Sequence, residues 1–274
     1  MFFSGWKDRV VRSLNQRGVA ATAWLAVLLL VKYLIQIPFR YLIQIPIRQA
    51  IQIPSRHLPR LSRSLTQLWK RCTTRNFENP FYQFLDRQYD RRFSVNTAGI
   101  DFRPTLLDPG VNAYSPIPRS TFFIVLRQIR IDYSKFVFID FGCGRGKPLL
   151  LASELPFQAI IGIELSQVLA RAAQDNWKTY RGPRKCQAFQ VVHTDARQYE
   201  LPRVPTVCFF YDPFKEAVVA KVLDNIRKSL ADAPREIYVL YVTPSQRHLM
   251  DQSGFLEPVK QTAGYCIYRS RACS

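Results

Sequence analysis

The stretch Phe136-Val-Phe-Ile-Asp140-Phe-Gly142-Cys-Gly144-Arg-Gly146 decides the fold, because it joins an apolar run to three glycines at alternate positions. The run 135–141 is predicted to be a buried strand. Since glycine has no Cβ, the turn after it leaves backbone N–H groups open to a ligand at the carboxyl end of the strand. The sequence therefore predicts a site for a nucleotide-sized ligand at this edge of a sheet.

The glycine spacing separates two classes of cofactor. A dinucleotide-binding turn, GxGxxG, would have its third glycine at position 147, where this chain has Lys147, and the third glycine here is Gly146. Pyrophosphate also needs an open helix N-terminus, whereas Pro148 begins the next helix at once and the acidic Asp140 precedes the loop. The pattern favours a cofactor that carries an ammonium and a sulfonium, and a nicotinamide-dependent oxidoreductase is the rival enzyme class.

A second carboxylate, Glu164, ends the next apolar run, Ala159–Glu164, about 20 residues beyond the glycines. Its position after a strand allows it to accept hydrogen bonds from both hydroxyls of a ribose. A glutamate at a strand end is by itself often only a solvated helix cap. The glycine loop and Glu164 together therefore carry more weight than either does alone.

Apolar runs alternate with helical patterns along the rest of the chain, which predicts an α/β Rossmann-like doubly wound sheet with right-handed crossovers. Two further extended runs, 255–262 and 264–269, meet near Gly264 and predict a hairpin that gives the mostly parallel sheet an antiparallel C-terminal edge strand. The remaining expected strands are 159–164, 188–193, 206–211 and 236–242, and the expected helices are 119–132, 148–155, 167–180 and 215–231.

With these motifs, residues 84–269 resemble the class I S-adenosylmethionine-dependent methyltransferases. The resemblance implies S-adenosyl-L-methionine as cofactor and assigns Asp195, with Ala196, to the adenine amino group. It also makes Tyr114, in the stretch before the first helix of the sheet domain, a contact for the methionine end of the cofactor. The other cofactor-binding residues that it implies are Asp140, Gly142, Cys143, Gly144, Gly146, Glu164 and Leu165.

The run Cys208-Phe-Phe-Tyr211-Asp212-Pro213-Phe214 is similar to the Asp/Asn-Pro-Pro-Tyr/Phe signature of methyltransferases that act on nitrogen, but it has a single proline. The candidate catalytic residues are therefore Asp212, Tyr211 and Phe214. Methyl transfer needs alignment of the acceptor more than acid–base help, and we expect Asp212 or nearby carbonyls to hold an amine while the aromatic rings stabilise its developing charge. No metal site is expected, because the six cysteines form no CxxC pair.

Residues 1–75 form a separate basic N-terminal region, ahead of a methyltransferase domain at 76–274. They hold 13 Lys and Arg against the single acid Asp8, which is a charge of +12 out of the chain's +19. Residues 18–37 are mostly apolar and about 20 long, the length of a helix that spans a bilayer. A spanning helix, an interfacial helix and a targeting segment are the alternatives, and an octapeptide IQIP repeat follows at 34–56.

The charge pattern of this region predicts its partner and its orientation. A basic, apolar segment suits anionic headgroups, so a membrane surface is the expected partner of residues 1–75. More basic residues follow the apolar stretch than precede it, which places the catalytic domain on the cytoplasmic side. The methyl acceptor is expected to be a protein side chain, a lysine near the membrane. The alternatives are RNA, a small molecule, or a cofactor-fold adaptor without activity.

Overall fold

The computed structural model describes residues 80–271, with side chains from Gln83 onward. The expected membrane segment 18–37 and the repeats 34–56 lie outside the described residues. Among residues 80–271, no helix combines the length and the apolar content needed to cross a bilayer.

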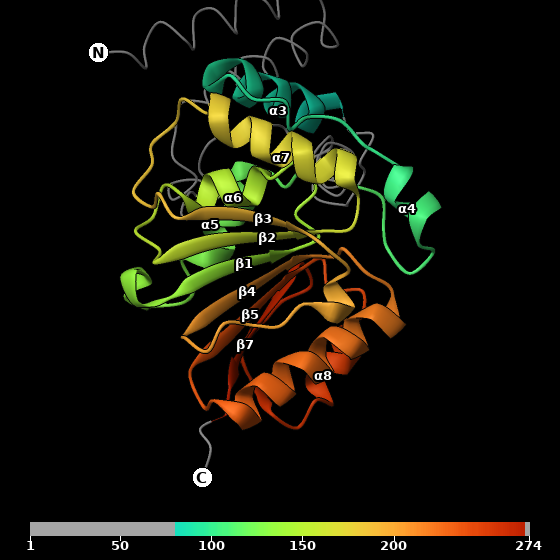
Figure 1. Cartoon of the computed structure of the whole chain (residues 1–274), viewed down its shortest axis with the longest axis vertical. Coiled ribbons are helices and arrows are strands. Elements are labelled where there is room, and N and C mark those ends of the chain that lie inside the picture. The colour runs from blue at the N-terminus through green and yellow to red at the C-terminus, as the bar shows by residue number, and fades with distance from the viewer. Residues whose placement is uncertain (1–79, 272–274) are drawn as a thin grey trace, which may run out of the picture. The chain divides into compact units, whose positions relative to one another are not determined.

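The centre of the domain is a seven-stranded sheet with the order β3-β2-β1-β4-β5-β7-β6 (Figure 1). Strands β1 to β5 are parallel, and β7 runs antiparallel to both of its neighbours. The strands are β1 (Val137–Phe141), β2 (Ala159–Glu164), β3 (Phe189–His193), β4 (Thr206–Tyr211), β5 (Ile237–Val242), β6 (Leu256–Gln261) and β7 (Tyr265–Ser270). The predicted Rossmann-like sheet with an antiparallel C-terminal edge is confirmed. Within that edge, β7 docks against β5 and β6 is outermost.

Helices cover both faces of the sheet, as Figure 1 shows with α5, α6 and α7 on one side and α8 on the other. Two apolar clusters fill the layers: Phe122, Leu149 and Phe209 belong to the first, and Val219, Phe210 and Tyr241 belong to the second. The helices are α3 (Pro80–Phe93), α4 (Arg103–Leu107), α5 (Arg119–Leu126), α6 (Lys147–Ala152), α7 (Gln167–Thr179), α8 (Glu216–Asp232) and α9 (Arg247–Asp251), with 3₁₀ turns η3 (Tyr133–Lys135) and η4 (Ala196–Gln198).

The helix expected at 119–132 ends early, at Leu126. Asp132 explains part of this difference, because its side chain accepts a hydrogen bond from the Ser134 backbone N–H and so caps the separate turn η3. Sequence periodicity did not predict α3, α4 or α9. Of these, α4 and α9 have five residues each, too few to show a helical period.

Candidate functional site

A cleft that is open to solvent at its mouth lies at the carboxyl ends of β1, β2 and β4. In a parallel sheet these ends share one edge, so residues far apart in sequence meet there. The predicted site residues that line it are Tyr114, Asp140, Gly142, Cys143, Gly144, Glu164, Leu165, Asp195, Ala196, Tyr211 and Phe214. Two predicted residues, Gly146 and Asp212, are not among the residues that line the cleft.

The glycine loop follows β1 with positive φ angles at its glycines, of which Gly144 (φ 55°) is the most crowded. A Cβ at Gly144 would lie 2.0 Å from Cδ2 of Tyr114, so the tyrosine ring packs directly on this glycine. Gly146 lies one turn further on, as the N-cap of α6 against Ala173 of α7. Gly146 therefore lies in the packing between two helices, and its role as a cofactor contact stays a prediction.

Asp140 is the most deeply buried acid of the cleft, with 1% of its surface exposed. Within the described chain its Oδ2 atom has no hydrogen-bond partner. Burial, and then the nearby negative charge of Glu164, raise the pKa of this carboxyl well above its ordinary value. A buried acceptor without a donor is costly, so the site is suited to a ligand that brings a cationic donor to Asp140.

Glu164 connects the second strand to the glycine loop. Its Oε2 accepts a hydrogen bond of 2.8 Å from the Gly144 N–H, and its Oε1 accepts one of 2.8 Å from the Ser166 N–H. Burial raises the pKa of Glu164, while these backbone donors act in the opposite direction. Since each carboxylate oxygen has a second lone pair, Glu164 can hold the loop and still accept hydrogen bonds from two hydroxyls of a ligand.

Asp195 begins η4, and its carboxylate is occupied by Arg197. Both oxygens accept from the Arg197 Nε, at 3.0 and 2.8 Å, and this hydrogen bonding is the main reason that the pKa of Asp195 is lowered. Arg197 also forms an ion pair of 2.5 Å with Asp108. The structure thus places Asp195 in the cleft in a pair with an arginine that the sequence analysis did not single out.

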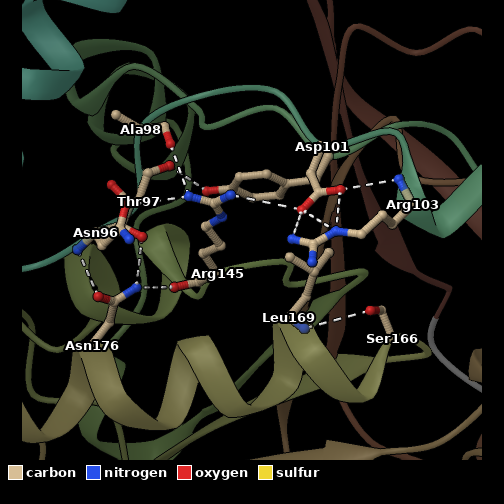
Figure 2. A network of polar contacts seen from close by, with 10 residues as sticks. Asn96, Thr97, Ala98, Asp101, Arg103, Arg145, Ser166, Leu169 and Asn176 are labelled. Carbon is tan, nitrogen blue, oxygen red and sulfur yellow. Dashed lines mark hydrogen bonds and ion pairs between the residues drawn. The ribbon is translucent and has the colours of Figure 1, made fainter.

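Residues 94–117, here called the strap, cross over the glycine loop. The Tyr114 hydroxyl donates to the Thr97 carbonyl at 2.6 Å. Arg145, which lies between two glycines of the loop, donates to the Ala98 carbonyl at 3.1 Å and the Asn96 Oδ1 at 3.2 Å. Figure 2 shows Arg145 at the centre of this network, with Asn176 of α7 below it. The glycine loop itself therefore holds the strap in place.

The structure gives Asp212 a different place from the one expected. Its side chain is buried and accepts hydrogen bonds from the Tyr241 hydroxyl at 3.0 Å and from the Ser245 hydroxyl, both outside the cleft. Its backbone has a positive φ of 43°. This turn sends the carboxylate toward β5 and leaves Tyr211, Pro213 and Phe214 to line the cleft. In this structure the Asp212 carboxylate is thus bound by hydroxyls outside the cleft lining, and its predicted role toward the acceptor stays a prediction.

No family model matches the chain, and no curated protein matches it. Among solved structures, an RNA methyltransferase from Salinibacter ruber in complex with S-adenosyl-L-homocysteine is 15% identical over 57% of this chain and 92% of its own, with a TM-score of 0.38. A putative RNA methyltransferase from Pyrococcus horikoshii is 17% identical over 57% and 83%, with a TM-score of 0.42. A tRNA methyltransferase from Aquifex aeolicus is 16% identical over 60% and 79%, with a TM-score of 0.40. The assignment of a Rossmann-like fold is based on the strand order and the strand register of this chain itself.

Proposed function

We propose that this protein is an S-adenosylmethionine-dependent methyltransferase whose cofactor lies in the cleft at the carboxyl ends of β1 and β2. The observation that carries the proposal is the buried Asp140 Oδ2, an acceptor without a partner in the described chain, beside a second buried carboxylate, Glu164. A zwitterionic cofactor with an ammonium and a sulfonium matches this charge. A pyrophosphate would be repelled by it.

The residues present fit such a cofactor. Glu164 would accept from the ribose hydroxyls, and Asp140 would accept from the ammonium. Asp195 and Ala196 would lie at the adenine end, which requires the Arg197 side chain to share or release the Asp195 carboxylate. Tyr114 would cover the methionine end, because its ring already packs on Gly144. When bound, the cofactor supplies a methyl group on a positively charged sulfur.

The acceptor would be oriented by the end of β4. Tyr211, Pro213 and Phe214 line the cleft there, and the Pro213 carbonyl accepts a hydrogen bond of 2.8 Å from the Asn112 N–H of the strap. The strap thus fixes the position of these side chains relative to the glycine loop. Aromatic faces at this point favour an acceptor that becomes cationic on methylation, such as an amine. A lysine side chain of a protein near a membrane stays the predicted acceptor.

Two experiments on the full chain test the proposed function. In isothermal titration, S-adenosylmethionine is expected to bind and NAD is not; binding of NAD alone would identify an oxidoreductase instead. In the second, labelled S-adenosylmethionine is incubated with the protein and separated membranes, soluble protein or RNA. Label in membrane protein supports the lysine prediction, and label in RNA contradicts it. If the chain binds no cofactor, it is an adaptor rather than an enzyme.

The raised pKa of Asp140 predicts opposite pH trends for stability and for cofactor binding. Because the folded state holds this proton more tightly than the unfolded state, the contribution of Asp140 to stability is greatest below its ordinary pKa and falls as pH rises through its folded pKa. An ammonium ligand prefers the ionised carboxylate, so cofactor affinity is expected to rise over the same range.

Both trends can be measured by comparing wild type with Asp140→Asn. Glu164 also has a raised pKa and is present in both proteins, so the difference between them reports Asp140 together with its electrostatic coupling to Glu164. Titrations in two buffers of different ionisation enthalpy are expected to show proton release on binding in wild type and less in the variant. Identical pH profiles for the two proteins would exclude a contact between Asp140 and the ammonium.

Asp212→Ala is expected to lower both the melting temperature and turnover, since it leaves the Tyr241 and Ser245 hydroxyls without their acceptor and frees the turn that carries Pro213 and Phe214. Loss of such buried hydrogen bonds costs about 1–3 kcal/mol. Asp212→Asn retains an acceptor oxygen and is expected to recover most of both properties. If turnover is lost in Asp212→Asn while the melting temperature is unchanged, the carboxylate acts on the acceptor after all.

A further inference from the structure

The short helix α4 and the residue that precedes it expose three large apolar side chains within six residues. Phe102, Leu106 and Leu107 are 66%, 83% and 60% exposed, and we call them the α4 patch. Single exposed apolar residues are ordinary on a protein surface, but a group on one short element is a common mark of an interaction site. The described chain offers this group no covering element.

The exposure of the patch does not come from a loosely held segment. On one side, Asp101 forms an ion pair with Arg145 of the glycine loop at 3.7 Å, and its backbone pairs with that of Tyr114 at 3.0 and 2.8 Å. On the other side, Asp108 is paired with Arg197 at 2.5 Å. The two acids that flank the patch are thus paired, Asp101 with Arg103 and Arg145, and Asp108 with Arg197, so both ends of the segment are held.

The same segment forms part of the cleft. Pro104 and Asp108 line the cleft, so the α4 patch lies at its mouth. In Figure 1, α4 projects beyond the carboxyl ends of the strands, away from the sheet and the other labelled helices. Whatever binds the α4 patch therefore lies directly beside the opening through which an acceptor enters.

We infer that the α4 patch inserts into the headgroup boundary of an anionic lipid bilayer. The Arg103 side chain is more than half exposed beside the apolar residues, although its guanidinium is paired with Asp101, one of the two acids that flank the patch. This pairing of apolar and basic side chains is that of an interfacial segment. The chain as a whole carries +19, of which +12 lies in residues 1–75, so an anionic surface attracts it over a longer range.

A membrane also explains why the patch stands at the cleft mouth. A bilayer bound through α4 faces the opening, so that a group at the bilayer surface reaches Tyr211 and Phe214 without leaving the membrane. This consequence, an acceptor presented by the membrane, rests on the proposed function. The insertion of the α4 patch does not, because it depends only on the exposed side chains and their charge.

The test places an environment-sensitive dye on the full-length chain. The four cysteines within residues 80–271 are buried, so Cys72→Ser and Cys273→Ser leave a background for labelling Leu106→Cys with nitrobenzoxadiazole. The matched control is Val259→Cys, an apolar position on β6 that is 47% exposed. Vesicles of phosphatidylcholine and phosphatidylglycerol at 3:1 are added, and vesicle binding is followed in parallel by flotation.

The dye at position 106 is expected to shift to the blue and brighten about threefold with vesicles, as a dye does on entering the acyl boundary, and the dye at position 259 is expected to stay unchanged. Salt of about 0.5 M should weaken the response by screening. The inference is overturned if the vesicles float with the protein but position 106 does not respond, if both positions respond equally, or if no vesicles bind.

A blue-shifted dye without vesicles overturns it too, by showing that the chain or a second copy covers the patch. Since no cofactor is used, failure here is distinct from failure to bind S-adenosylmethionine.

Discussion

Glu164→Ala is expected to weaken the binding of S-adenosylmethionine about 100-fold. Two hydrogen bonds from ribose hydroxyls to a carboxylate contribute about 1.5–3 kcal/mol each, and a loss of about 2.7 kcal/mol already corresponds to a factor of 100. The same substitution removes the acceptor of the Gly144 and Ser166 N–H groups, so the glycine loop loses its connection to β2 as well. The first effect acts on the cofactor-bound state alone, whereas the second also loosens the glycine loop of the free protein.

Isothermal titration measures this prediction directly, with Glu257→Gln as the matched control. Glu257 lies on the outermost strand β6 in an exposed pair with Arg269, and its loss is expected to leave affinity unchanged. Glu164→Gln keeps one acceptor oxygen and should bind with intermediate affinity. Wild-type affinity in Glu164→Ala would remove the ribose contact from the proposed site.

Gly146→Ala is expected to destabilise the domain by about 3 kcal/mol. An L residue in the left-handed region costs about 1–2 kcal/mol, and Gly146 has a φ of 80°. The added Cβ would also lie 2.9 Å from the Ala173 Cβ and 3.3 Å from its Cα, so α6 and α7 must move apart. A small shift of either helix cannot relieve this strain without disturbing the core, because both helices pack on the same face of the sheet.

Urea unfolding of three variants separates the two causes. Gly264→Ala, a glycine with nothing within 4 Å of its added Cβ, should change stability by less than about 0.5 kcal/mol. The double variant Gly146→Ala with Ala173→Gly removes the contact with the Ala173 Cβ but neither the one with its Cα nor the positive φ, and should recover only part of the loss. A Gly146→Ala protein as stable as wild type would show that neither constraint acts at this position.

The sequence predicted strands and site residues correctly where an apolar run ends in a glycine or a carboxylate. The bounds of β2 and β4 match the predicted runs 159–164 and 206–211, because these strands are mostly buried and mostly apolar. Glu164 meets the glycine loop in the cleft since parallel strands end at one edge. The N-terminal predictions, the membrane segment 18–37 and the cytoplasmic location, stay predictions.

The sequence by itself determined the parallel sheet, the glycine loop and the two buried carboxylates of the cleft, because strand periodicity and strand ends are local features. Tertiary structure decided the rest. Asp212 turns toward Tyr241 and Ser245 because of its positive φ, and Arg145 and Arg197 fasten the strap through partners 44 and 89 residues earlier in the chain, Asp101 and Asp108. Ion pairs between residues so far apart produce no local sequence pattern, since folding alone brings the two partners together.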